Sequence, residues 1–246
     1  MASRYRFLFS LRWVGLCLLA VALIASCIFL GTWQYGRYSD RAATNVRIAE
    51  AGSMEPSDAT SLMSVEKAPA GDAEWQVVKA SGVYDRDSEV LVRNRSVGGQ
   101  TGFEVITPLV LNDGVTLLVD RGFVPASKQG AMTLPDVPEA PTGEVTVTGR
   151  LRVSESEVGK MNSVDGVLQA RSIAVQQIGE KIDATVLAGY VTQEDADTGL
   201  TPIPVEKERA WQNFAYAYQW WIFAGMIPIG FVVLARREAK TSAAAA

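Results

Sequence analysis

The sequence predicts an α+β membrane protein, in which two transmembrane helices flank an extracytoplasmic antiparallel β domain with one short helix. Three observations lead to this fold class. Two long uncharged runs lie at 13–33 and 210–235. Between them, short runs rich in β-branched residues alternate with Gly, Asp, Asn and Pro, which is typical of strands and turns. Basic residues flank each uncharged run on the side that faces the nearer end of the chain.

The first uncharged run is long enough to cross a membrane. Residues 13–33 form a helix of roughly 32 Å at about 1.5 Å per residue, and the hydrocarbon core is about 30 Å thick. A cleaved signal peptide is the alternative. Its apolar region would be only about 7–15 residues long, and FLGTW at 29–33 is a poor cleavage site. We therefore expect a retained transmembrane helix at 13–35.

The second uncharged run combines an interfacial start with an aliphatic continuation. It opens with WQNFAYAYQWW at 211–221 and becomes aliphatic at 227–234. Aromatic and amide side chains favour the headgroup level of a membrane, so we expect one interfacial and transmembrane helix at 209–235. Pro228 is compatible with such a helix because neighbouring helices can satisfy the freed carbonyl.

The flanking charges predict the orientation. Residues 1–12 carry three arginines and no acid, and the tail at 236–246 carries three basic residues and one acid. Cytoplasmic flanks are enriched in Lys and Arg, so we expect both ends in the cytoplasm and the domain at 36–208 on the extracytoplasmic side of the membrane. Within 38–208, 26 acidic residues face 15 basic ones, a balance that argues against nucleic-acid binding.

The central domain is expected to be an antiparallel sheet or small barrel after a flexible loop. Residues 44–73 are rich in Ala, Ser, Asp, Glu and Pro without periodicity, which predicts the loop. Strands are expected in the runs WQVVKASGVYD, EVLVRNR, FEVITPLVL, VTLLVDRGFVP and EVTVTGRLRVS, and again at 186–193.

Two local patterns refine the domain. Asn-Asp-Gly at 112–114 is a tight-turn sequence, so the runs at 103–111 and 115–123 are expected to form an antiparallel hairpin. In SIAVQQIGEKI at 172–182, the apolar residues recur at helical spacing, which predicts a short helix.

The sequence offers no arrangement for catalysis. It contains no histidine, which removes the commonest general base and the commonest metal ligand. Cys17 and Cys27 lie about 15 Å apart along one expected helix, too far for a disulfide. A membrane-tethered hydrolase therefore lacks its nucleophile and base, and we expect a non-catalytic protein without a metal site.

Aromatic rings, amides and guanidinium groups are expected at one membrane depth, where the first span ends and the second begins. The candidate site residues are Trp33, Gln34, Arg37, Arg209, Asn213, Tyr216, Gln219 and Trp220. Topology alone favours an aromatic belt with arginines on lipid phosphates. The alternative is a recognition site for an amphipathic anion with a flat apolar body, because arginine forks match carboxylates and rings stack on planar ligands.

Several motifs resemble one known family in the same order. They are LGTWQYGR at 30–37, GVYD at 82–85, VRNR with GGQTGFEVITPL at 92–109, LLVDRGFVP at 117–125 and FAYAYQWW at 214–221. Together they are similar to the Surfeit locus protein 1 family of cytochrome c oxidase assembly factors. The resemblance implies a factor that assists insertion of haem a into a haem-copper oxidase of the aa3 type, or stabilises that oxidase. It also implies a location in the plasma membrane of a bacterium. The implied partners are oxidase subunits, a respiratory supercomplex and membrane lipid.

The resemblance supplies a candidate anion and shows one departure. Haem propionates would meet Arg37 and Arg209 at the outer interface. Family members generally carry a histidine, proposed as a haem ligand, in a pattern like NHxxYAxxW, and the matching position here is Asn213. Met226 or Cys27 could ligate iron, although packing at lipid depth explains both better. The departure favours an accessory subunit of the oxidase or supercomplex that binds no haem.

Two further expectations concern alternatives. A membrane-anchored extracytoplasmic binding or sensing module is another interpretation, although flanks of 12 and 11 residues hold no signalling domain. Within the strands, Arg93, Arg95 and Arg121 could contact a ligand or serve the domain itself. We expect Arg121 to form an ion pair inside the domain, either in the neighbourhood of Asp120 or with Glu104.

Overall fold

The computed structural model describes most of the chain. The described residues are 7–127, 133–195, 197, 199–205 and 207–244, with side chains up to residue 241.

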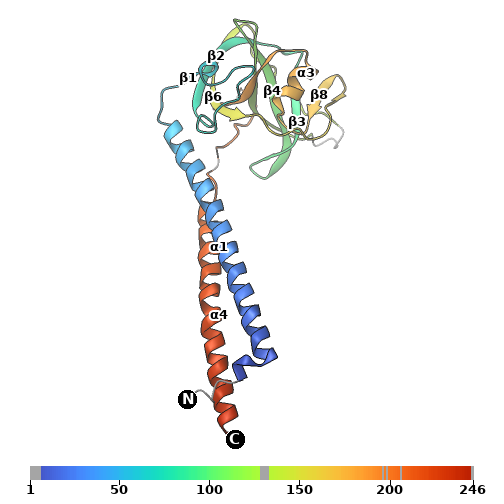
Figure 1. Cartoon of the computed structure of the whole chain (residues 1–246). Helices are drawn as coiled ribbons and strands as arrows, with labels where there is room; N and C mark the ends of the chain where they lie inside the picture. Colours follow the sequence, from blue (N-terminus) through green and yellow to red (C-terminus); the bar gives the residue numbers. More distant parts are fainter. Residues whose placement is uncertain (1–6, 128–132, 196, 198, 206, 245–246) are drawn as a thin grey trace. The chain divides into compact units, whose positions relative to one another are not determined.

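The chain divides into two compact units. One comprises residues 1–45 and 207–246, and the other comprises residues 46–206. Helices α1 (Leu11–Ala51) and α4 (Ala210–Ala244) lie side by side in the first unit (Figure 1). Both are long and apolar enough to cross a membrane. The prediction of two apolar helices that flank a β-rich domain is therefore confirmed.

Helix α1 is longer than the span expected from hydropathy. It continues past residue 35 to Ala51, so the first residues of the expected loop at 44–73 are helical. Residues 42–51 contain four alanines and neither Gly nor Pro, which favours helix. The last turns also bury Ile48 and Ala51, and Gly52 follows the helix end.

The rest of the expected loop is tied to the domain. Strand β1 (Ser57–Asp58) pairs in parallel with the sheet, and α2 (Ala59–Leu62) follows it directly. Asp58 caps α2, because its Oδ1 accepts a hydrogen bond from the Thr60 amide at 2.9 Å. Ala59 and Met63 are fully buried in the core. The segment that forms β1 and α2 is short and polar, and only two of its apolar residues are buried in the core. Its sequence therefore has too little periodicity to be distinguished from a loop.

The second unit is built on one nine-stranded sheet, and the strands expected from the sequence are present. They are β2 (Val77–Tyr84), β3 (Val90–Val97), β4 (Gln100–Leu111), β5 (Thr116–Pro125), β6 (Glu144–Val153) and β9 (Val186–Gln193). The short strands β7 (Asn162–Val164) and β8 (Val167–Ala170) were not expected. The hairpin between β4 and β5 is confirmed by their antiparallel pairing.

The sheet closes into a small barrel. The strand order is β1-β2-β6-β9-β5-β4-β3-β8-β7, and an additional β2–β4 pairing joins β2, β6, β9, β5 and β4 in a ring. Val83 pairs with Glu144 on one side and with Val110 on the other. Gly82 permits this approach, because a Cβ there would lie 2.3 Å from the Val110 carbonyl oxygen.

The sheet is mixed, which corrects the expectation of an antiparallel domain. Strands β5 and β9 are parallel neighbours, and so are β3 and β8. Parallel neighbours need long crossover connections, and local turn sequences do not specify which distant strands will pair.

Three separate clusters of buried apolar side chains lie among the described residues of this unit, and two of them are larger than the third. The largest one lies inside the barrel and includes Val78, Leu109, Val119, Leu151 and Val191. The second core packs α3 (Val175–Lys181) against β3, β4 and β5. The short helix expected at 172–182 is thus confirmed over its central residues. A buried side chain of this size contributes roughly 1.5–3 kcal/mol, so these cores supply much of the domain's stability.

Candidate functional site

A chain of polar side chains connects α1 to α4 in the first unit. The Nδ2 of Asn213 donates a hydrogen bond to the Oε1 of Gln34 at 2.7 Å. Arg41 donates from Nη1 to the Oδ1 of Asn213 at 2.9 Å. Both polar atoms of the Asn213 amide are therefore occupied by groups on α1, and Asn213 acts as a hydrogen-bonded bridge between the two helices.

The same chain continues to the start of α4. Arg41 also forms an ion pair from Nε to Glu208 at 2.9 Å. The backbone amide of Glu208 donates to the Oδ1 of Asn45 at 2.8 Å, and the Nδ2 of Asn45 donates to the Glu208 carbonyl at 2.9 Å. Because the guanidinium of Arg41 is bound by a carboxylate and an amide, it serves a structural role and is not available to bind an anionic ligand.

The structure brings together only part of the candidate set. Gln34 and Asn213 are in direct contact, as described. Arg37 is exposed, and its guanidinium lies 5.8 Å from the centre of the Trp33 ring, a cation–π distance. Arg209 is exposed and directly precedes α4. On α4, Tyr216 and Gln219 are exposed and Trp220 is half-buried.

Sequence reasoning missed three members of the polar chain. Arg41 follows Gln34 by seven residues, so both lie on one face of α1, and this spacing was the available signal. Asn45 continues the same face four residues later. Glu208 precedes α4 and gives no periodic signal, since its role depends on the tertiary pairing of the helices.

Aromatic side chains line the same helix pair. The centroid of Tyr38 lies 5.1 Å from that of Phe214, and Tyr35 lies 5.9 Å from Trp221. Within α4, Phe214 and Tyr218 lie 4.8 Å apart. These separations suit favourable tilted ring pairs. The rings are therefore in contact with one another across the two helices.

One glycine allows the close approach of an aromatic ring. A Cβ at Gly31 would lie 2.4 Å from the Nε1 of Trp221. Gly31 is also buried, whereas Gly36, one and a half turns later, has nothing within 4 Å of such a Cβ. Small residues at helix contacts are a common means of bringing membrane helices together.

The helix pair does not present the ligand set of a histidine-bound haem. Asn213 uses both polar atoms in helix contacts. Met226 lies 13 residues further along α4, roughly 20 Å away along the axis, and its side chain is 60% exposed. Cys27 is buried in α1, seven residues before Gln34. Among the described residues, no group of three or more Cys, Asp or Glu side chains is arranged to hold a metal ion.

The second unit contains a fully buried arginine. Arg121 pairs from Nε with Asp197 at 2.6 Å and from Nη1 with Glu89 at 3.0 Å. Its Nη2 donates to the Pro138 carbonyl at 3.1 Å, and the Tyr84 ring lies 5.8 Å away. The ion pair expected inside the domain exists, but its partners are Glu89 and Asp197 rather than Glu104. Burial raises the pKa of Glu89, although Thr107 and Arg121 favour its charged form.

Glu104 belongs to another cluster on the sheet. It pairs with Arg95 at 2.8 Å, and Arg95 also binds Glu155 at 2.7 Å. Burial raises the pKa of Glu104, whereas the positive charge of Arg95 acts to lower it. Asp120 is completely buried nearby, and burial together with the Glu104 charge raises its pKa well above the usual range. These carboxyl groups make the interior of the domain sensitive to pH.

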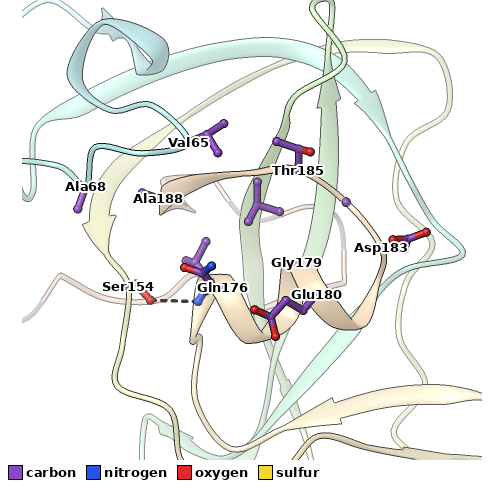
Figure 2. Close-up of a pocket in the computed structure, with 12 residues that line it drawn as sticks. Val65, Ala68, Ser154, Gln176, Gly179, Glu180, Asp183, Thr185 and Ala188 are labelled. Carbon is purple, nitrogen blue, oxygen red and sulfur yellow. Dashed lines mark hydrogen bonds between the residues drawn. The ribbon is translucent and has the colours of Figure 1, made fainter.

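A hollow of about 560 Å³ lies beside α3 (Figure 2). Glu180 and Asp183 lie on its rim, and none of the side chains lining it is basic. The hydroxyl of Ser154 accepts a hydrogen bond from the Val175 amide at 3.0 Å, so it is used at the start of the helix. This hollow lacks the positive charge that an anionic ligand would need, and it holds no nucleophile paired with a base.

Comparison with known proteins agrees with the resemblance noted in the sequence. The sequence model of the SURF1 family matches residues 21–225. A SURF1-like protein of Mycobacterium tuberculosis is 35% identical over 242 residues, which cover 96% of this chain and 88% of that protein. Surfeit locus protein 1 of Xenopus tropicalis is 30% identical over 162 residues, or 59% of this chain and 49% of that protein. The human Surfeit locus protein 1 is 31% identical over 147 residues, or 52% of this chain and 46% of that protein. The chain therefore belongs to the SURF1 family.

Proposed function

We propose that this chain is a non-catalytic assembly or accessory factor of a haem-copper cytochrome c oxidase of the aa3 type. Membership of the SURF1 family carries the proposal. In this role the two apolar helices anchor the protein beside the oxidase, and the β domain contacts the oxidase outside the membrane. The chain either assists insertion of haem a or stabilises the assembled enzyme.

The proposed topology places both termini in the cytoplasm of a bacterium and the β domain on the outer side of its plasma membrane. Arginines in residues 1–12 and basic residues in 236–246 support this orientation. Single cysteines introduced at two exposed positions, Ser53 and Thr241, in a variant without Cys17 and Cys27, test it with an impermeant thiol reagent in intact cells. Labelling is expected at Ser53→Cys only, and the reverse pattern would refute the topology.

A specific observation favours the accessory role over haem carriage. Asn213 occupies the position at which the family resemblance expects a histidine, and its amide is engaged by Gln34 and Arg41. An amide oxygen held by a guanidinium is a poor iron ligand. We therefore infer that the chain acts through contacts with oxidase subunits or a respiratory supercomplex, and that haem a is not its own cofactor.

Deletion of the gene tests the general role. Reduced-minus-oxidised spectra of membranes should lose a-type haem signal, and oxidase activity should fall. A deletion strain with an unchanged a-type signal and unchanged activity would contradict the proposal.

Affinity purification in mild detergent separates the two forms of the proposal. Stoichiometric recovery with oxidase subunits, and no haem absorption from the isolated chain, supports a resident accessory subunit. Substoichiometric recovery with haem absorption by the isolated chain supports transient haem delivery.

A further inference from the structure

A second hollow, in the β domain, differs in character from the one beside α3. It has a volume of about 390 Å³ and is lined by strands β3, β4, β7 and β8 together with residues 133 and 134. Its polar lining includes Arg93, Asn94, Asn162 and Gln169, and its apolar lining includes Phe103 and Leu134. The lining residues include no acidic side chain. The volume and mixture are typical of small-ligand pockets.

A β-bulge explains why Arg93 points into this hollow. In the β3–β4 ladder, Arg93 pairs with Phe103 and Arg95 pairs with Gly102, so Asn94 is an extra residue, with φ +63°. The bulge places Arg93 and Arg95 on opposite faces of the sheet. Arg95 reaches Glu104 and Glu155 on one face, while Arg93 lies beside Phe103 on the other.

Arg93 has no carboxylate partner among the described residues. Its Nε is buried, and no described group accepts a hydrogen bond from it. Each of the other arginines on the strands of this sheet has an acidic partner within 3.3 Å, namely Arg95, Arg121, Arg150 and Arg152. A half-buried guanidinium with an unused donor, in a hollow free of acids, is arranged to receive an anion.

Gln169 is a second polar residue in the wall of this hollow. It is only 6% exposed. It pairs with Leu91 in the β3–β8 ladder and with Asn162 in the β7–β8 ladder. A glutamine amide can both donate and accept hydrogen bonds, so Gln169 can contact a ligand that enters this hollow beside Arg93.

We propose that this pocket binds a carboxylate carried on a small apolar body. Arg93 forms the fork that receives the carboxylate, Gln169 and Asn162 donate or accept at its edge, and Phe103 and Leu134 contact the apolar part. A single guanidinium matches a single negative charge better than a dianionic phosphate. The carboxylate belongs either to a free organic acid or to an acidic side chain of a partner polypeptide.

Ligand-observed NMR on the full-length protein in a nonionic detergent tests the chemistry. The first pair of probes is benzoate and its neutral analogue benzamide. The second pair is a blocked Ala-Glu-Phe peptide and its neutral analogue, blocked Ala-Gln-Phe. A higher affinity for benzoate than for benzamide indicates a free organic acid as the ligand. A higher affinity for the Glu peptide than for the Gln peptide indicates an acidic side chain of a partner polypeptide. Either result supports the site, and no preference for either charged probe overturns it.

Arg93→Met should weaken binding of the preferred probe by about tenfold or more, since Arg93 is the only cation among the described residues of the lining. Arg171→Met is the matched control, because Arg171 is exposed and lies outside the pocket lining. It should leave binding unchanged. Equal binding by Arg93→Met and the wild type would overturn the proposal.

Gln169→Glu keeps the proposal testable if Arg93→Met fails to fold. A carboxylate at this position would pair with Arg93 from within the chain and exclude the external one. This variant should raise the thermal unfolding midpoint and abolish binding of the charged probe. A Gln169→Glu protein that still binds the probe with wild-type affinity would contradict the assignment.

Discussion

The Nδ2 of Asn213 on α4 donates a hydrogen bond to the Oε1 of Gln34 on α1 over 2.7 Å, and this bond joins two residues that lie 179 positions apart in the chain. Arg41 completes the bridge from the other side of the amide. The residue that the family resemblance marks as a haem-ligand position is thus a structural connector in this chain.

Replacing Asn213 by Leu should destabilise the helix pair by about 1–3 kcal/mol, because Gln34 and Arg41 would each lose a partner. Asn213→Asp should be tolerated, since a carboxylate can accept from Arg41 and from the Gln34 amide. Thermal unfolding of the purified full-length variants in detergent measures the difference. An Asn213→Leu midpoint equal to that of the wild type would show that the bridge adds nothing to stability.

Gly31→Ala should loosen the contact between α1 and Trp221, because the new methyl group would overlap the indole. Gly36→Ala is the control at an open position of the same helix. There, alanine should be neutral or stabilise the helix by up to about 1 kcal/mol. Tryptophan fluorescence during thermal unfolding reports both effects. A lower midpoint for Gly36→Ala than for Gly31→Ala would contradict the steric explanation.

Arg37→Ala should lower oxidase assembly while leaving the amount of inserted protein unchanged. Arg37 is exposed and contacts only Trp33 among the described aromatic rings, so its removal costs the fold little. Arg41→Ala should instead reduce the protein level, since Arg41 holds Asn213 and Glu208 together. Immunoblots of membranes alongside oxidase spectra separate these outcomes. Parallel loss of protein and oxidase in Arg37→Ala would assign Arg37 to stability.

Arg121→Met should cost about 3–5 kcal/mol of unfolding free energy, because Glu89 and Asp197 would remain partly buried without their cation. Arg171→Met, at an exposed position, should change it by less than about 0.5 kcal/mol. Denaturant titration of the full-length protein followed by circular dichroism provides the measurement. A small loss for Arg121→Met would show that the carboxylates find other partners.

The buried carboxyl groups predict a pH dependence with a definite sign. The pKa of Asp120 is raised in the folded state, so its contribution to stability is fully present below its ordinary pKa of about 4 and is lost as pH rises through the raised value. Asp120→Asn removes this loss, because an amide stays neutral. The gain in unfolding midpoint over the wild type should therefore be larger at about pH 8 than at about pH 5. Equal gains at both pH values would assign the effect to packing.

Local patterns were sufficient to predict most elements of this chain. The uncharged runs at 13–33 and 210–235 predicted both long helices, since a run of this length without charge has few other stable environments. Alternating β-branched runs predicted the longer strands. Asn-Asp-Gly at 112–114 predicted the hairpin between β4 and β5, because these residues accept the positive φ that the turn requires.

The limits of local pattern appear at particular residues. Residues 44–51 look like a loop by composition, yet they are helical, and Ile48 and Ala51 in this segment are buried. The parallel neighbours β5 and β9, and the ring closed by β2 and β4, depend on contacts between distant segments. No window of sequence contains both partners of such a pair.

The sequence by itself determined the residue types of the candidate site: two amides, several aromatic rings and arginines near the ends of two apolar helices. Only the tertiary structure decided which of them act together. It joined Asn213 to Gln34 and Arg41, paired Arg121 with Glu89 and Asp197, and left Arg93 without an acid among the described residues. The physical reason is that a side chain's charge and hydrogen-bonding capacity are intrinsic to its type, whereas their use depends on neighbours that folding supplies.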